Sequence, residues 1–145
     1  MAAPASYLYA NAKKYYADGA ATTKIDWAGG TIKAVLVASA YTPDYDNHAF
    51  FSSVTNTVGT AASLTTKTET KIGTGATAKY ALKSDVASFT GSLTARGLVI
   101  YQDTGTASTS PLICYVLLDS APADVTTTVG INVTPDATNG WVLVG

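Results

Sequence analysis

Charged residues are scarce in this chain: Asp, Glu, Lys and Arg make up 13% of its 145 residues, and the net charge is −1. An average soluble domain has roughly 25% charged residues. The lysines and arginines are scattered singly, so no basic stripe could follow a phosphate backbone, and we expect no nucleic-acid partner. Threonine, serine, alanine and glycine must therefore cover much of the surface.

The chain has one cysteine and one histidine. Cys114 can form no internal disulfide, and its setting in PLICYVLL predicts a buried apolar side chain. No apolar run approaches the roughly 20 residues of a membrane-spanning helix, and the start MAAPASYLYANAKKYY lacks the apolar core of a signal peptide. We expect no membrane partner and a protein made in a cytosol.

The pattern of apolar residues changes once along the chain. Between residues 7 and 18 they recur at helical spacing, and Gly19 offers a C-cap, which predicts one short helix. From Lys24 onward, runs rich in Val, Ile, Leu, Tyr and Thr alternate with turn residues. We therefore predict an all-β protein: an N-terminal segment with the helix (residues 1–23), then one antiparallel β-sandwich or barrel-like domain (residues 24–145).

Two hairpins and one central strand are predicted in the β region. TIKAVLVAS (31–39) is apolar on both faces apart from one lysine, which indicates a strand covered on both sides. Residues 93–103 and 111–119 are similar, and the small polar loop between them indicates a hairpin. Residues 129–135 and 140–145 predict a second hairpin across Asn139-Gly140.

The middle of the chain, residues 52–91, is rich in threonine and serine with a few alternating apolar residues. This pattern indicates exposed strands and long loops with one lightly buried face. It also suits contact with a partner.

The segment SAYTPDYDNHAFF (39–51) places Asp44, Asp46 and His48 at two-residue intervals. A calcium loop of the EF-hand type that began at Asp44 would need a glycine at its sixth position and a bidentate acid at its twelfth, where this chain has Ala49 and Thr55. A zinc site needs about three convergent ligands. We therefore expect no metal and no cofactor here.

Turn chemistry explains the same segment better. We expect residues 41–44 to form a turn in which the proline fixes φ and the following aspartate caps the backbone. The histidine should form hydrogen bonds at the exit of a core strand, and one of the two phenylalanines should anchor the loop in the core. The residues expected to structure the loop are Pro43, Asp44, His48, Phe50 and Phe51.

Other catalytic patterns are weaker still. No G-x-S-x-G nucleophile turn is present, and GTGATAK (73–79) lacks the spacing of a phosphate-binding loop. The acids Asp119 and Asp124 are close in sequence, but their spacing does not indicate an opposed pair for glycoside chemistry. Trp27 and Trp141 could stack on a sugar, although such tryptophans are more often core or interface residues. We expect no enzyme activity.

Three stretches resemble a known family: KIDWAGGTIKAVLVASAYTPDYDNHAFFSSVTN, SFTGSLTARGLVIYQDTGTASTSPLICYVLL and the closing GWVLVG. They are similar to small tailed-bacteriophage and prophage proteins that carry I-D-W, T-I-K, Y-T-P-D-x-D-x-H-x-F-F-S-x-V and T-A-R-x-x-x-I-Y-x-D-T-G-T-x-x-x-S-P-L-I-x-Y. The resemblance covers roughly half of the chain, and the middle matches loosely. It implies a virion structural protein without catalytic residues, made in the host bacterial cytoplasm.

Within that family we expect a capsid decoration (cement) protein on the capsid surface, with the major capsid protein and further copies of itself as partners. A trimer would match the local threefold symmetry of a shell. The alternative is a tail or baseplate component, or a small fibre module that binds the host surface, with residues 104–110 in contact with a receptor. A small cell-wall hydrolase is a third class that depends only on the histidine loop. The residues predicted at interfaces are Tyr7, Tyr9, Tyr15, Tyr16 and Trp141.

Overall fold

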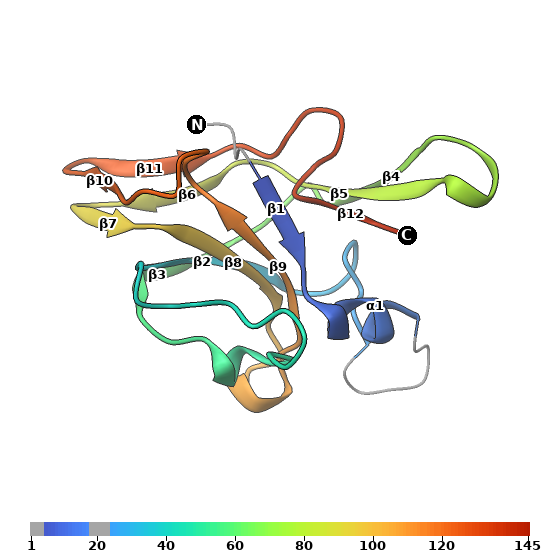
Figure 1. The fold of residues 1–145 in the computed structure, drawn as a ribbon, viewed down its shortest axis with the longest axis horizontal. Coiled ribbons are helices and arrows are strands. Elements are labelled where there is room, and N and C mark those ends of the chain that lie inside the picture. The colour runs from blue at the N-terminus through green and yellow to red at the C-terminus, as the bar shows by residue number, and fades with distance from the viewer. Residues whose placement is uncertain (1–4, 18–23) are drawn as a thin grey trace.

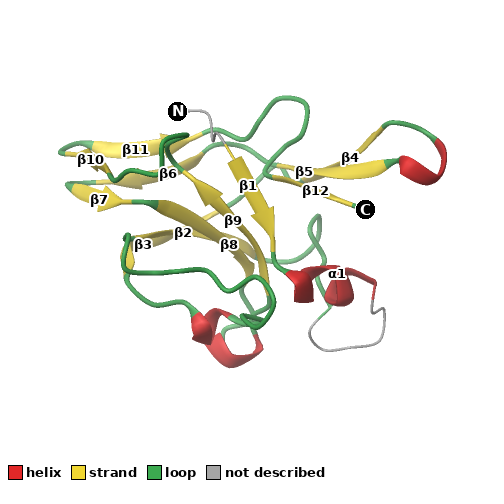
Figure 2. Cartoon of the chain, viewed as in Figure 1, coloured by secondary structure: helices red, strands yellow, loops and turns green. Residues whose placement is uncertain are grey.

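The computed structural model describes residues 5–17 and 24–145, and these residues form antiparallel β-structure with one short α-helix. Figure 1 and Figure 2 show the arrangement. The elements are β1 (Ala5–Leu8), α1 (Ala10–Ala17), β2 (Ile32–Val37), η1 (Phe51–Ser53), β3 (Thr57–Ser63), β4 (Thr68–Ile72), η2 (Gly75–Thr77), β5 (Lys79–Lys83), β6 (Ala87–Thr90), β7 (Leu93–Ala95), β8 (Gly97–Gln102), η3 (Ala107–Thr109), β9 (Leu112–Leu117), β10 (Val125–Thr127), β11 (Gly130–Val133) and β12 (Val142–Val144). The predicted all-β, antiparallel class with a short N-terminal helix is confirmed, and none of the sheets in the described part closes into a barrel.

The largest sheet has five strands in the order β1-β9-β8-β2-β3. Its strands β2, β8 and β9 are the three long apolar runs of the sequence, and almost all of their side chains are buried. Strand β2 lies between β8 and β3 in the sheet. Only one of its six side chains is not fully buried, so both of its faces are covered, as predicted. Strands β8 and β9 pair as an antiparallel hairpin across residues 104–110, which confirms the first predicted hairpin.

Three smaller sheets lie above the five-stranded sheet in the view of Figure 1. They have the orders β10-β7, β11-β6 and β12-β5-β4. The β4–β5 hairpin extends beyond the other strands at one side of the molecule (Figure 1). Strand β3 at the edge of the large sheet and β4 at the edge of a small one consist mainly of exposed residues, which confirms the prediction for residues 52–91.

Both tryptophans lie in the core, where Trp27 is 0% and Trp141 is 1% exposed. The indole N–H of Trp27 donates to the carbonyl oxygen of Lys83 over 3.0 Å, and that of Trp141 donates to Ser84 Oγ over 2.7 Å. A buried indole N–H needs such an acceptor, because an unpaired polar group in the core costs about 1–3 kcal/mol. The two indoles therefore form hydrogen bonds with the last residue of β5 and with the residue that follows it.

The structure corrects the predicted start of the helix. Residues 5–8 form β1, which pairs with β9 from Ala5↔Leu117 to Leu8↔Cys114, and the helix begins at Ala10. The apolar residues of this stretch fit both periods, and pairing with a distant strand decides between them. The predicted end at residue 18 and the C-cap at Gly19 lie outside the described residues.

The second predicted hairpin is wrong. The turn itself exists, since the N–H and carbonyl groups of Asp136 and Gly140 exchange hydrogen bonds over 2.9 and 3.2 Å. The strands on its two sides then part: β11 pairs with β6, and β12 pairs with β5. A local turn signal fixes the turn but not the partner of each flanking strand.

Candidate functional site

The Asp44 carboxylate is used within its own loop. Its Oδ1 accepts hydrogen bonds from the backbone N–H groups of Asp46 and Asn47, each over 3.1 Å, and its Oδ2 accepts one from Asn47 Nδ2 over 2.9 Å. The bond from the Asn47 side chain, followed by the backbone bonds, holds the pKa of Asp44 below its ordinary value. The backbone N–H of His48 donates to the Asp44 carbonyl over 2.9 Å and closes the turn.

His48 ends a chain of hydrogen bonds that reaches into the core. Its Nδ1 accepts from the backbone N–H of Asp44 over 3.2 Å and lies 3.1 Å from the hydroxyl of Tyr41, which in turn lies 2.8 Å from the hydroxyl of Tyr9. Because a backbone N–H can only donate, Nδ1 carries no proton, and the Tyr41 hydroxyl donates to it. The Tyr9 hydroxyl then donates to Tyr41. No sequence signal pointed to this role of Tyr41, because the hydrogen bonds join it to Tyr9, which lies 32 residues away in the sequence.

The two phenylalanines fix the end of the loop. The Phe51 ring stacks on Tyr101 at 4.1 Å between centroids, and the Phe50 ring contacts Tyr15 of α1 at 5.6 Å. The Phe51 N–H also donates to the Ser110 carbonyl over 2.8 Å, at the base of the β8–β9 loop. Both rings are half-buried, and Phe51 packs against the core. The predicted aromatic anchor is therefore confirmed at Phe51.

The turn lies a few residues from its predicted position. Tyr41 donates from its backbone N–H to Ala38 over 3.1 Å, and the next turn runs from Asp44 to His48, so Pro43 lies between two turns. The predicted capping by Asp44 and hydrogen bonding by His48 are confirmed. Across residues 5–17 and 24–145, no group of three or more His, Cys, Asp or Glu side chains could hold a metal ion.

The residues predicted at an interface differ in exposure. Tyr7 is 45% exposed and lies against Tyr45, whereas Tyr15 and Tyr16 are half-buried. Tyr9 and Trp141 are buried, Tyr9 at 0% exposure, and burial is also the main cause that raises the pKa of Tyr9. In the folded chain these two side chains serve the core, which corrects their assignment as contact residues.

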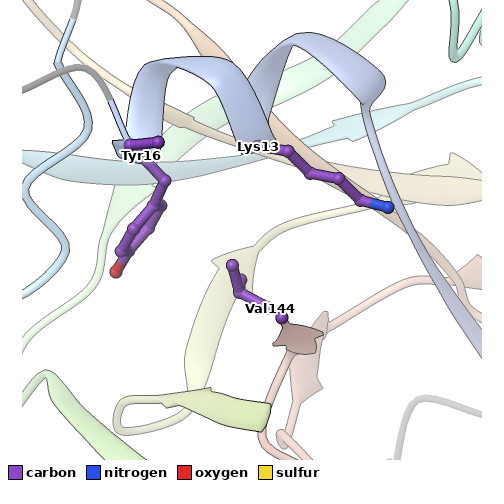
Figure 3. A pocket seen from close by; sticks show the side chains of 5 residues that line it. Lys13, Tyr16 and Val144 are labelled. Atoms are coloured by element: carbon purple, nitrogen blue, oxygen red, sulfur yellow. The ribbon is translucent and has the colours of Figure 1, made fainter. Parts of the chain in front are cut away.

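A small cleft separates α1 from the C-terminal strand (Figure 3). Lys13, Tyr16 and Ala17 line it from the helix, and Val144 and Gly145 line it from the other side. Its volume is about 270 Å³, below the roughly 300–1,000 Å³ of most small-molecule sites. The Tyr16 hydroxyl donates to Glu69 Oε1 of β4 and so joins the helix to the β4–β5 hairpin. The cleft is lined by one cationic side chain, that of Lys13, and by apolar groups, and its lining does not pair an acid with a base for a reaction.

Comparison with protein-family models, with curated proteins and with solved structures finds no match. In the described part of the chain, no helix is long and apolar enough to cross a membrane.

Proposed function

We propose that this chain is a structural protein of a tailed-bacteriophage virion, and that it decorates the mature capsid by binding the major capsid protein between capsomers. The sequence resemblance to small phage and prophage proteins supports the first part of the proposal. The protein acts without a catalytic step, as a homo-oligomer at symmetric sites of the shell, and a trimer would match a local threefold axis.

One observation carries the proposal. Asp44 and His48, the residues that most resemble a catalytic or metal site, use their polar atoms in hydrogen bonds that hold their own loop. The carboxylate of Asp44 and Nδ1 of His48 accept five hydrogen bonds between them, from backbone and side-chain groups of residues 41–47. The resemblance to phage proteins includes this loop, so the matching residues maintain a shape. A maintained shape is what a protein that works by docking requires.

The exposed strands supply surface for docking. Strand β3 presents Thr, Gly and Ser residues to solvent, strand β4 presents two Thr, one Glu and one Lys, and the β4–β5 hairpin projects from the body (Figure 1). The surface of β3 costs little to desolvate, because it has no charge to bury. Tyr7 adds an exposed aromatic side chain on β1.

The proposed mechanism is thermodynamic. A protein that binds the assembled shell and not the separate subunits stabilises the shell by mass action, by about 2.7 kcal/mol per site at a free concentration one hundred times the dissociation constant. Many symmetry-related copies multiply this modest contribution. The effect opposes the internal pressure of packaged DNA, which separates the capsomers.

Electron cryomicroscopy of the virion that contains this chain tests the proposal. We expect density with this fold in many copies on the head, between capsomers. Density only at the tail would overturn the capsid assignment. A binding assay gives a second test: the chain should sediment with assembled capsids and not with free capsid subunits, and Tyr7→Ala should weaken this binding while the thermal midpoint changes little.

A tail, baseplate or host-binding module is the second candidate. The observation in its favour is one end of the molecule where η1 and η3 lie together and residues 104–109 are mostly exposed. The hydroxyls of Thr104, Thr109 and Ser110 form a network there that includes the carbonyl oxygen of Thr106, and this network fixes the loop as a receptor-binding loop requires. Copies confined to the tail tip in the same reconstruction would favour this candidate.

A further inference from the structure

The outer edge of β4 is a free sheet edge in the described part of the chain. Strand β4 pairs with β5 along all of its length, from Thr68↔Lys83 to Ile72↔Lys79, and with no other described strand. Its first four residues are exposed, and Ile72 is half-buried. The hairpin also extends away from the body (Figure 1), so a second strand could approach this edge.

The edge strand β3 of the large sheet carries backbone irregularities that discourage pairing, and β4 carries none. The edge strand β3 has a register shift opposite Ala34 and Leu36, and Gly59 within it has φ of +70°. Irregularities of this kind twist an edge away from partners. The register of β4 against β5 is continuous, and its five residues contain neither proline nor glycine.

The charges of β4 are ordered so that the strand complements itself. Its sequence is TETKI, and an antiparallel pair of two copies that is centred on Thr70 places Glu69 of each copy directly opposite Lys71 of the other. Opposite charges in such cross-strand positions stabilise a sheet, and a central Thr–Thr pair is also favourable. Glu69 and Lys71 lie on the same face of the strand, since alternate residues do.

The neighbouring registers are unfavourable. When a twofold axis relates two antiparallel strands, one residue of each strand lies opposite the same residue of the other copy. The registers adjacent to the one centred on Thr70 are therefore centred on Glu69 or on Lys71. A centre at Glu69 opposes two carboxylates, and a centre at Lys71 opposes two ammonium groups. Charges on an edge strand usually prevent pairing; here their order disfavours the two registers adjacent to the one centred on Thr70.

A hydrogen bond from the helix restrains the Glu69 side chain. The Tyr16 hydroxyl of α1 donates to Glu69 Oε1. A carboxylate has further acceptor positions after one such bond. The helix therefore limits the rotamers of Glu69, which lowers the entropy that the carboxylate would lose on pairing with a lysine.

From this geometry we propose that two copies of the chain associate through their β4 strands, in antiparallel pairing centred on Thr70, so that two three-stranded sheets become one six-stranded sheet. The partner is a second copy of this chain. The contact goes beyond the proposed capsid binding, and in a shell it would connect copies bound at neighbouring sites across a twofold axis.

The first test uses charge reversal and sedimentation of the purified chain without capsid. Lys71→Glu should weaken self-association at least about tenfold, because two symmetry-related attractive pairs become repulsive. This variant keeps the bond between Tyr16 and Glu69, so the fold should be retained. The double change Glu69→Lys with Lys71→Glu restores both pairs and should restore association, and an equal mixture of E69K and K71E should form mixed dimers although each alone does not.

The second test measures the register by oxidative crosslinking. Thr70→Cys places two thiols opposite each other with Cα atoms about 4.5–5.5 Å apart, within the range of a disulfide. Thr68→Cys is the matched control, because its two copies would lie about 13 Å apart along the strands. Cys114 is buried and gives no background. We expect a covalent dimer for T70C alone.

A chain that stays monomeric at about 1 mM, a K71E variant that associates like the unchanged chain, or equal crosslinking of T68C and T70C would each overturn the proposal. At about 1 mM an association worth roughly 4 kcal/mol would still be visible. Since no capsid is present in these measurements, their failure leaves the proposed capsid binding untouched, and a failure of capsid binding leaves them valid.

Discussion

The hydrogen-bond chain from Tyr9 through Tyr41 to His48 makes an unusual prediction: removing two hydroxyl groups should destabilise the protein less than removing one. Tyr41→Phe removes the acceptor of the Tyr9 hydroxyl and one donor to His48. Tyr9 is 0% exposed, so its hydroxyl would be left buried without a partner. Two lost bonds at about 0.5–1.5 kcal/mol each and an orphaned group at about 1–3 kcal/mol give an expected loss of about 2–6 kcal/mol.

Tyr9→Phe should cost only about 1 kcal/mol, since the Tyr41 hydroxyl can still donate to His48. In the variant with both changes the orphaned hydroxyl is gone, and we expect a stability about 1–2 kcal/mol above that of Tyr41→Phe alone. Additive effects would instead place the double variant below both single variants.

Urea unfolding followed by the fluorescence of Trp27 and Trp141, both buried, measures these differences. With a slope of about 2 kcal/mol per molar urea, the second substitution should raise the midpoint of Tyr41→Phe by about 0.5–1 M at unchanged slope. Tyr80→Phe, at a position 49% exposed, is the control and should stay within about 0.5 kcal/mol of the unchanged chain. A double variant less stable than Tyr41→Phe would refute the assigned direction of the bonds.

Three further predictions concern the same loop and the C-terminal turn. His48→Asn should retain more stability than His48→Ala, by about 1 kcal/mol in urea, because the Asn side-chain oxygen can take the place of Nδ1. The lowered pKa of Asp44 implies stability that is present above about pH 4 and is lost as the pH falls through that lowered value, so Asp44→Asn should flatten the acid limb of a plot of thermal midpoint against pH. Gly140→Ala should cost more than about 2 kcal/mol, because φ is +66° and a Cβ would lie 2.2 Å from the Leu82 carbonyl oxygen; an unchanged urea midpoint would contradict this.

Apolar runs and turn residues were enough to predict the class of fold, the central strand β2 and the β8–β9 hairpin, because these depend on patterns within about 30 residues. The pairing of β11 and β12 with separate distant strands could not be predicted, since their local pattern equals that of a hairpin. The burial of Tyr9 could not be predicted from the local pattern either. Its buried hydroxyl needs a hydrogen-bond partner, and that partner, Tyr41, lies 32 residues away in the sequence.

The self-complementary order of charges in β4 was visible in the sequence as TETKI. It became meaningful only once the structure placed that segment at a free edge with a regular register. A central strand with the same sequence would already pair with a strand on each side, so the symmetric order of its charges could not bring two copies together.

The topology of the pairings also sets the order in which the chain can fold. Strand β9 can join β8 as soon as both have left the ribosome, but β1 must wait for β9, more than 100 residues later, and β5 waits for β12, about 60 residues later. Long-range pairings of this kind slow folding, because loop closure precedes any gain from contact. During synthesis, β1 therefore remains without this partner until β9 appears, and β5 remains without β12 until the end of the chain appears. Rapid chaperone engagement at these two segments would limit their misassociation.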